Sequence, residues 1–557
     1  MARSELEVDV KLAPTDQKLR GGYYTPQPIA RFLCEWAIHD QAARVLEPSC
    51  GDGNVLLEAA VVLSGLARSK DGVGDLITGI ELDEKEAASC IKRLRGRDLS
   101  VSRKNVLVGD FFEHCRDLCA KGARFDAVVG NPPFIRYQNF SENQRRVAIE
   151  IMEAAGLRPN RLMNSWAPFL VGSTRLLSDY GRLAMVIPAE LLQVNYAAET
   201  RRFLSESYSR ITLVTFRRLV FEGIQQEVVL LLGEKNGTER IGIRTIELGG
   251  IDELGAYEHA DFSSEGLKPI DHSTEKWTQY FLTTEEILLL RRIKKDQRVK
   301  RVSDLAEVDV GIVTGLNEFF VVNQDKMREL ALRSHTLPIV SRSPQLAGIV
   351  YSRSDWRANA EDNLPAFLLD LPDVPLQRLS ASVRKYIVEG ESRGHHEGYK
   401  CRIRKRWYIV PSVWSPDAFM LRQVHCYPRV ILNKSSATCT DTIHRVRFRS
   451  GTPREAFTAA FLNSMTFAFS EVMGRSYGGG VLELEPREAE ALPIPFGGAD
   501  KLELKRINDL VLAGDIEGVL NLTDAVLLQA GLGLSRREIK MLHGIWVKLR
   551  DRRNSRR

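Results

Sequence analysis

Short apolar runs alternate with amphipathic stretches between about residue 43 and residue 235 of the chain. The apolar runs are typical of buried strands, and the stretches between them have helical periodicity. The predicted strands are RVLEPS (44–49), LITGIEL (76–82), FDAVVGN (125–131), GRLAMVIPA (181–189), ITLVTF (211–216) and EVVLLLGE (227–234). The predicted helices are NVLLEAAVVLSGLA (54–67), EKEAASCIKRL (84–94) and SWAPFLVGSTRLLSDY (165–180). This alternation predicts an α/β domain with a parallel, doubly wound sheet.

The pattern changes after residue 235. Residues 236–280 are rich in Gly and acids, which indicates a boundary, and FLTTEEILLLRRIKK (281–295) is predicted to be a helix. Irregular short strands, Gly-rich turns and Arg-rich segments then continue to LPIPF (492–496). We therefore expect four segments: an α/β domain over 1–235, a linker and bridging helix over 236–295, a mostly β domain over 296–496, and a basic helical segment over 497–557.

Composition limits the class of protein. The chain has 557 residues, of which 44% are hydrophobic and 27% charged, as in ordinary soluble proteins. The start, MARSELEVDVKLAP, has no signal-peptide stretch, and no run approaches the roughly eighteen apolar residues of a membrane span, so we expect a cytoplasmic protein. The cysteines form no CxxC pair, and His114, Cys115 and Cys119 have no second half-site. Reduced thiols and no metal are expected.

The net charge of +6 is mild, but basic residues concentrate in SRREIKMLHGIWVKLRDRRNSRR (535–557). Two interpretations stay open for this end: a solvated tail, or a segment that contacts phosphates.

The segment VLEPSCGDGNVLLEAA (45–60) is predicted to form a strand, a glycine-containing turn and a helix. Gly51 and Gly53 permit a tight turn and close ligand approach, and Glu47 and Asp52 place carboxylates at the carboxyl end of the strand. A dinucleotide site would need a third glycine, and these acids would repel its phosphates. The sulfonium and free amino group of S-adenosylmethionine fit this turn better than NAD does.

Two further strands also end in acids. Glu81 in GIELDE lies where an acidic residue binds both ribose hydroxyls, although it is further from Gly51 than the roughly twenty residues of a dinucleotide fold. Asp110 in VGDFF is placed to accept from an adenine amino group, and Phe111 to pack on the ring. Each acid alone is as typical of a surface or helix cap, but acids at successive strand ends favour a cofactor site.

The stretch FDAVVGNPPF (125–134) ends an apolar strand on an amide, two prolines and an aromatic residue. Neither proline can donate a ladder hydrogen bond, and each restricts the preceding residue to extended backbone. Asn131 and Phe134 are thus expected on a stiff rim above the sheet. The alternative is a proline-rich turn that only closes the strand.

Together these motifs resemble the gamma-class adenine-N6 DNA methyltransferases of the TaqI type over residues 21–235. The resemblance lies in YYTP (23–26), LEPSCGDG (46–53), GIELDE (79–84), GDFF (109–112), GNPPF (130–134), VIPAELL (186–192) and VFEGIQQEVVLLL (220–232). The second domain resembles the target-recognition domain of that family in VDVGIVTGLNEFFVVN (308–323), YPRVILNKSSATCTDTIHRVRF (427–448) and YGGGVLELEPREAEALPIPF (477–496).

The resemblance implies a seven-stranded, Rossmann-like, S-adenosylmethionine-dependent methyltransferase domain, followed by a DNA target-recognition domain and a short helical end. Its activity would be that of a site-specific adenine DNA methyltransferase (EC 2.1.1.72) acting on double-stranded DNA. A restriction endonuclease or defence-system subunit would be a separate chain. The residues implied to bind the cofactor are Tyr24, Thr25, Glu47, Ser49, Cys50, Gly51, Glu81, Leu82, Asp110, Phe111 and Asn131.

The Asn-Pro-Pro-Phe motif suits methylation of a poor nucleophile. The lone pair of an exocyclic adenine amine is conjugated into the ring, and two acceptors, the Asn131 side-chain oxygen and the Pro132 carbonyl, would take its two hydrogens. A base inside a duplex must be flipped out and stacked on aromatic faces, for which the resemblance implies Phe134 and Phe221. The implied catalytic residues are therefore Asn131, Pro132, Pro133, Phe134 and Phe221.

Basic residues in the second domain gather in GHHEGYKCRIRKRWYIVPS (394–412), beside Trp407 and Tyr408. A solvated hairpin is one interpretation; in a domain joined to a base-flipping enzyme, phosphate and groove contacts are favoured. The candidate nucleic-acid-binding residues are Lys400, Arg402, Arg404, Lys405 and Arg406.

Three other functions stay open. A glutamine-N5 methyltransferase shares the Asn-Pro-Pro chemistry but is shorter. An RNA guanine-N2 methyltransferase also carries Phe where most of the adenine enzymes have Tyr, as at Phe134. A non-catalytic DNA-binding subunit would not need the intact motif series.

Overall fold

The computed structural model describes two compact units along the chain, with the division between Phe281 and Leu282. No helix among the described residues has the length and apolar character needed to span a bilayer. The described residues are 24–160, 162–218, 220–221, 227–236, 241–256, 266–273, 275–477 and 479–555.

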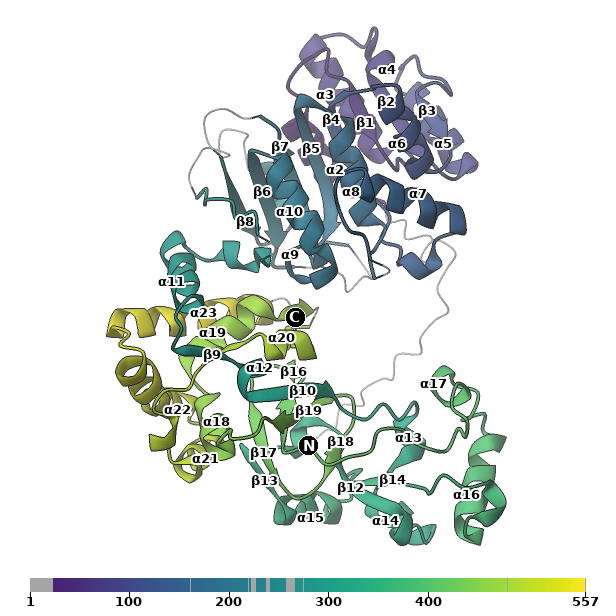
Figure 1. Cartoon of the computed structure of the whole chain (residues 1–557). Helices are drawn as coiled ribbons and strands as arrows, with labels where there is room; N and C mark the ends of the chain where they lie inside the picture. Colours follow the sequence, from purple (N-terminus) through teal and green to yellow (C-terminus); the bar gives the residue numbers. More distant parts are fainter. Residues whose placement is uncertain are drawn as a thin grey trace, which may run out of the picture. The chain divides into compact units, whose positions relative to one another are not determined.

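The first unit is built on an eight-stranded sheet with the order β3-β2-β1-β4-β5-β7-β6-β8 (Figure 1). Strands β1 to β5 pair in parallel, as the sequence predicted, whereas β7 runs antiparallel to both β5 and β6. The strands are β1 Val45–Glu47, β2 Ile77–Glu81, β3 Val106–Val108, β4 Phe125–Gly130, β5 Leu177–Pro188, β6 Arg210–Phe216, β7 Val228–Glu234 and β8 Gly242–Leu248.

The sheet is therefore mixed where a parallel sheet was predicted, and it has eight strands where seven were expected. Residues 217–227, which connect β6 to β7, are at the lower limit of the crossover of about a dozen or more residues that parallel neighbours need, and β7 pairs antiparallel with β6. The additional strand is β8, which pairs in parallel with β6 at the edge of the sheet.

Helices lie between the successive strands β1 to β6 of the first unit. Helix α8 is buried along almost its whole length, and it ends at Leu176 rather than near 180 because its last predicted residues begin β5. The main helices are α2 Gln27–Ala37, α3 Asn54–Ala67, α5 Glu84–Arg95, α6 Phe111–Ala120, α7 Glu142–Glu153, α8 Trp166–Leu176 and α10 Ala198–Ser207.

Much of the segment predicted as a linker, 236–295, belongs to the first unit. Besides β8, the segment contains the 3-10 helix η5 Trp277–Phe281, whose Trp277 and Tyr280 are fully buried. The Thr245 hydroxyl on β8 donates to the Tyr280 carbonyl at 3.0 Å. The sequence pattern did not predict a strand here because β8 is an edge strand with half-buried polar residues, so its apolar pattern is weak.

The second unit begins with the predicted helix, α11 Thr284–Lys294, and mixes small sheets with helices. A five-stranded sheet has the order β10-β19-β15-β17-β13, and a four-stranded sheet has the order β11-β14-β12-β18. Their strands are β10 Ala306–Val310, β11 Val321–Val322, β12 Thr336–Val340, β13 Val350–Ser352, β14 Phe367–Leu369, β15 Ala418–Leu421, β17 Val430–Lys434, β18 Thr438–Cys439 and β19 Ile443–Phe448.

Smaller sheets and several helices complete the second unit. The smaller sheets contain β9 Val299–Arg301, β16 Gln423–Val424, β20 Arg475–Tyr477, β21 Val481–Glu483 and β22 Pro493–Pro495. The longer helices are α15 Arg353–Glu361, α16 Ala381–Ser392, α19 Ser464–Met473, α21 Leu504–Leu512, α22 Ile516–Thr523 and α23 Arg536–Asn554.

The basic end of the chain is not a solvated tail up to residue 555. Helix α23 packs on α19, and its Arg553 forms a buried ion pair with Glu471 at 2.9 Å, with the side chains 2% and 3% exposed. Arg553 also donates to the His425 carbonyl at 2.6 Å. This helix is part of the core of the second unit.

We predict that Glu471→Leu destabilises the second unit by about 3–5 kcal/mol, because removal of one partner leaves the Arg553 charge buried and uncompensated. Urea unfolding followed by circular dichroism measures the change. The control is Glu285→Ala, which breaks the exposed pair with Arg537 and should cost less than about 1 kcal/mol. An equal decrease in the free energy of unfolding for the two variants would show that the buried pair stabilises the unit no more than the exposed pair does.

Candidate active site

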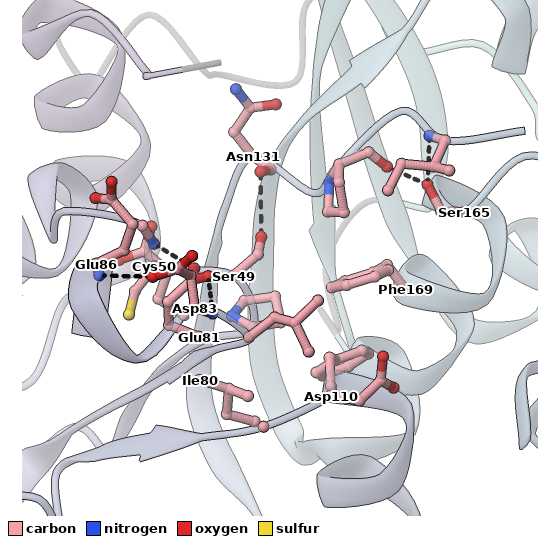
Figure 2. A pocket seen from close by; sticks show the side chains of 18 of the residues that line it. Ser49, Cys50, Ile80, Glu81, Asp83, Glu86, Asp110, Asn131, Ser165 and Phe169 are labelled. Carbon is pink, nitrogen blue, oxygen red and sulfur yellow. Dashed lines mark hydrogen bonds between the residues drawn. The ribbon is translucent and has the colours of Figure 1, made fainter. Parts of the chain in front are cut away.

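A cavity of about 530 Å³ opens beside the carboxyl ends of β1, β2, β3 and β4 (Figure 2). Ligands of open α/β sheets bind at this edge, where the loops that follow the strands meet. The cavity is lined by all the residues predicted for the cofactor: Tyr24, Thr25, Glu47, Ser49, Cys50, Gly51, Glu81, Leu82, Asp110, Phe111 and Asn131. Among the predicted catalytic residues Pro133 also lines it, whereas Pro132, Phe134 and Phe221 are not part of the lining.

The turn after β1 depends on glycine. Gly53 has φ +88° at the N-cap of α3, and a Cβ atom there would lie 2.5 Å from Cys90 Sγ. The turn therefore approaches α5 as closely as a bare backbone allows. Asp52 in this turn pairs with Arg93 at 2.6 Å, so one of the two carboxylates predicted at the end of this strand is neutralised within the protein.

Glu81 connects two of the loops that form the cavity. Its Oε2 accepts from the Gly51 N–H at 2.8 Å, and its Oε1 accepts from the Asp83 N–H at 2.9 Å. A carboxylate has about four acceptor positions, so both oxygens can still accept from a ligand. The carboxylate is thus held in place by the backbone before any ligand binds.

Glu47 is buried at the end of β1, with 2% of its surface exposed. Burial raises the pKa of this carboxyl well above its usual value, and the neighbouring Glu81 and Asp52 act in the same direction. Among the described residues, no group hydrogen-bonds to its Oε2. A buried acceptor with a spare oxygen, in a cavity also lined by Glu81 and Asp83, fits a ligand that carries positive charge and N–H donors.

Asp110 has a double role in the structure. Its Oδ1 accepts from the Phe112 N–H at 2.8 Å and so caps α6, while its Oδ2 accepts from Gln144 Nε2 at 2.7 Å. The helix-cap alternative therefore holds for Asp110 together with its place in the cavity. Phe111 stacks on Phe169 with ring centroids 4.5 Å apart, so its ring is part of the core and borders the cavity there.

Gln144 also lines the cavity, although sequence reasoning did not single it out. It is the third residue of α7, where its side-chain oxygen accepts from the Ser141 N–H at 2.9 Å, and the Ser141 hydroxyl accepts from the Gln144 N–H at 3.2 Å. This reciprocal cap is visible in the sequence as Ser-x-x-Gln. Its link to Asp110, however, joins segments far apart in the chain.

Two serines fix the Asn-Pro-Pro-Phe rim. The Ser49 hydroxyl donates to the Asn131 carbonyl at 3.2 Å, and the Ser165 hydroxyl, beside the start of α8, donates to the Pro133 carbonyl and accepts from the Ile135 N–H at 2.8 Å. In Figure 2 the side-chain amide of Asn131 points away from Glu81 and Asp83, while its backbone carbonyl faces Ser49. Hydrogen bonds therefore hold the rim on both sides.

The two aromatic residues expected to stack on a base lie on one apolar core. Phe221 is 9% exposed and belongs to the core of the first unit, and Phe134 is half-buried and packs against the same core. Residues 222–226 of the matching motif, VFEGIQQEVVLLL, and Tyr23 of YYTP lie outside the described residues.

The predicted nucleic-acid-binding residues lie in the second unit and divide into two groups. Lys400, Arg402 and Lys405 are exposed, whereas Arg404 and Arg406 make contacts within the protein. Across the described residues, no group of three His, Cys, Asp or Glu side chains is arranged to hold a metal ion.

Comparison with known proteins finds two family matches that together span most of the chain. Residues 10–307 match the N-6 DNA Methylase family, and residues 274–528 match the family described as Type II methyltransferase M.Eco57I, C-terminal domain.

Individual relatives are similar over the same span. The chain is 23% identical over 495 residues to Type II methyltransferase M.AccI of Acinetobacter calcoaceticus, covering 86% of each chain. The identity to M.XamI of Xanthomonas campestris pv. amaranthicola is also 23% over 495 residues, covering 85% of each. Among solved structures, the fold is similar to that of the Type IIL restriction-modification enzyme MmeI in complex with DNA, with a TM-score of 0.58 and 12% identity over 92% of this chain and 73% of that one.

We predict that Gln144→Leu loosens the start of α7, because the variant lacks both the cap on Ser141 and the bond to Asp110. Removal of a cap costs about 0.5–2 kcal/mol, which corresponds to roughly a two- to thirtyfold faster exchange of the local backbone amides if they exchange by local opening. Hydrogen exchange by mass spectrometry over the peptides of 135–153 measures this. Gln138→Leu, at an exposed position of the same loop, is the control. Unchanged exchange in the Gln144 variant would show that this side chain does not stabilise the start of α7.

Proposed function

Since the chain belongs to the N-6 DNA methylase family, we propose that its cavity binds S-adenosylmethionine and that the Asn131–Phe134 rim presents the target base to the methyl group. The chain is an N6-adenine DNA methyltransferase of restriction-modification systems, with the activity EC 2.1.1.72. The family assignment disfavours the guanine-N2 and glutamine-N5 alternatives.

The observation that carries the cofactor proposal is the set of acids in one cavity. The bound cofactor supplies a methyl group made electrophilic by a sulfonium. Glu47, with its spare buried oxygen, would accept from the cofactor's amino group, and Thr25 would hold the carboxylate. Glu81, fixed by two backbone N–H groups, would accept from the ribose hydroxyls. Asp110 retains acceptor capacity for the adenine amine.

The rim's own groups would prepare the target amine. The Asn131 side-chain oxygen and the Pro132 carbonyl would accept the two N–H hydrogens, which favours a tetrahedral nitrogen whose lone pair points at the methyl carbon. The amine would attack the methyl group that the cofactor supplies, with the thioether as leaving group, and its nitrogen would release a proton to water only after it has become cationic. No strong base is therefore needed, and positioning supplies most of the rate.

Stacking on the flipped base is proposed for Phe134. Its half-buried ring lies next to the Pro132-Pro133 backbone, which limits its motion. Phe221 is more deeply buried, so its role would be to support Phe134 through the shared core or to present only a ring edge.

DNA recognition is proposed for residues 296–496, with the methyltransferase chemistry in the first unit. The match of residues 274–528 to the C-terminal domain of M.Eco57I supports a separate recognition unit. The substrate would be double-stranded DNA, and a restriction endonuclease would act as a separate chain.

We expect Asn131→Ala to reduce methyl transfer on the order of a hundredfold or more, since one preorganised acceptor is removed from the reacting amine. Cofactor affinity should change little. Single-turnover transfer of a labelled methyl group to DNA measures the rate, and calorimetry measures the affinity. Asn143→Ala, on the exposed face of α7, is the matched control. Near-normal turnover in the Asn131 variant would exclude the proposed mechanism.

We also expect cofactor affinity to rise with pH as Glu47 ionises. Burial raises the pKa of the free protein's Glu47, and a bound ammonium group favours the ionised form, so binding releases a proton. Affinity therefore increases as pH rises through the raised pKa. Calorimetry in buffers of different ionisation enthalpy counts the released proton. Glu47→Gln should abolish the release, and an identical pH dependence in that variant would assign the proton elsewhere.

A further inference from the structure

A small surface of the second unit exposes apolar and basic side chains together. It lies on the short helix α17 (Tyr399–Arg402) and the residues after it, and we call it the α17 surface. Tyr399 and Ile403 are 64% and 61% exposed. Lys400, Arg402 and Lys405 are exposed beside them, and no ion pair in the described part of the chain involves these three. Exposed apolar groups among such cations are typical of a binding surface.

The other two basic residues of this segment, Arg404 and Arg406, make contacts within the protein next to the α17 surface. Arg404 donates to the Val313 and Thr314 carbonyls at 3.0 and 2.8 Å, and its guanidinium lies over the Phe320 ring at 5.6 Å. Arg406 pairs with Asp373. These contacts tie the residues that follow α17 to two neighbouring loops of the second unit.

The loop that Arg404 contacts packs directly against α17. Gly315 in this loop has φ +84°, and a Cβ atom there would lie 2.9 Å from Lys400 Cβ and 3.2 Å from Cys401 Sγ. Only glycine combines this backbone with such close approach. Trp407, which follows the surface, packs on Phe319 with ring centroids 4.9 Å apart and donates to Glu391 at 2.9 Å.

The chemistry of the α17 surface fits a duplex DNA groove. Cations on flexible side chains neutralise phosphates, and a planar or branched apolar group between them reaches base edges, the thymine methyl group or a base step. Arg404 donates to three backbone carbonyls, those of Val313, Thr314 and Trp407, so most of its hydrogen-bonding capacity is used within the protein.

We propose that the α17 surface contacts the target DNA, with Lys400, Arg402 and Lys405 on phosphates and Tyr399 and Ile403 on bases, and that Arg404 is a positioning residue. This inference rests on the proposed function and assigns it a recognition element. The apolar pair contributes to sequence discrimination, and the cations contribute affinity for any sequence.

Two multiple variants separate these roles. The probes are a short duplex that carries the sequence methylated by the wild-type protein, identified by modified-adenine sequencing, and a scrambled duplex. K400A/R402A/K405A should weaken binding to both duplexes and lower the slope of log affinity against log salt by about one for each phosphate that is no longer neutralised. Y399S/I403S should lower the ratio of specific to scrambled affinity by about tenfold or more and leave the salt slope unchanged.

Arg404 is tested by substitution in both directions. R404A should reduce discrimination as Y399S/I403S does, and R404K should restore only part of it because an ammonium cannot reproduce the guanidinium's fork. Circular dichroism confirms that each variant is folded.

The matched control is K501A/K505A/R506A, which removes the same charge from exposed positions of the second unit. If K400A/R402A/K405A and Y399S/I403S both behave like this control, the inference is overturned. Loss of binding to phosphatidylserine vesicles with DNA binding intact would also overturn it, in favour of a membrane surface. Wild-type cofactor binding and methylation are measured in parallel, so a failure there identifies the proposed function as the error.

Discussion

The bonds from the Glu81 carboxylate to the N–H groups of Gly51 and Asp83 are the interaction on which the candidate site depends. Parallel strands bring the ends of distant segments to one edge of a sheet, but the loops that follow have no ladder to satisfy their backbone groups. In this chain acidic and hydroxyl side chains take that role. Glu81 joins the loops after β1 and β2, and Ser49 joins the β1 turn to Asn131. Ser165 bonds to the backbone carbonyl of Pro133 and the backbone N–H of Ile135.

The same arrangement explains the charge of the cavity. Glu81, Asp83 and Asp110 accept from backbone N–H groups beside the cavity, and the buried Glu47 lines the same small volume. Burying a carboxylate without a compensating partner costs free energy, as the raised pKa of the buried Glu47 shows. A cationic ligand with hydroxyl and amino groups offsets that cost. The carboxylates that support the loops are thus the groups that would bind a sulfonium cofactor under the proposed function.

Arginine has two uses in the second unit, and only the structure separates them. Arg445 is buried on β19, where it donates to the Val310 and Ser412 carbonyls at 2.9 and 2.8 Å and pairs with Asp309. Arg553 and Arg404 fasten other segments in the same way. A count of basic residues in this unit would therefore overstate the number available to contact phosphates, because a guanidinium can satisfy several backbone carbonyls where a loop cannot pair with a strand.

The sequence by itself determined the strands β1, β2, β4, β5, β6 and β7 and many of the residues that line the cavity, because both are local. A buried strand and the Gly, Asp or Asn-Pro-Pro segment that follows it are contiguous in the chain, and strand-end positions share one edge in any parallel sheet. The tertiary structure alone decided the antiparallel β7, the place of β8 in the sheet, the burial of Phe221, and the roles of Gln144 and Ser165. It also separated Arg404 and Arg406 from their exposed neighbours. Each of these depends on which distant segments meet. A contact between residues far apart in the chain does not change the local pattern of apolar and polar positions, so the sequence pattern cannot predict it.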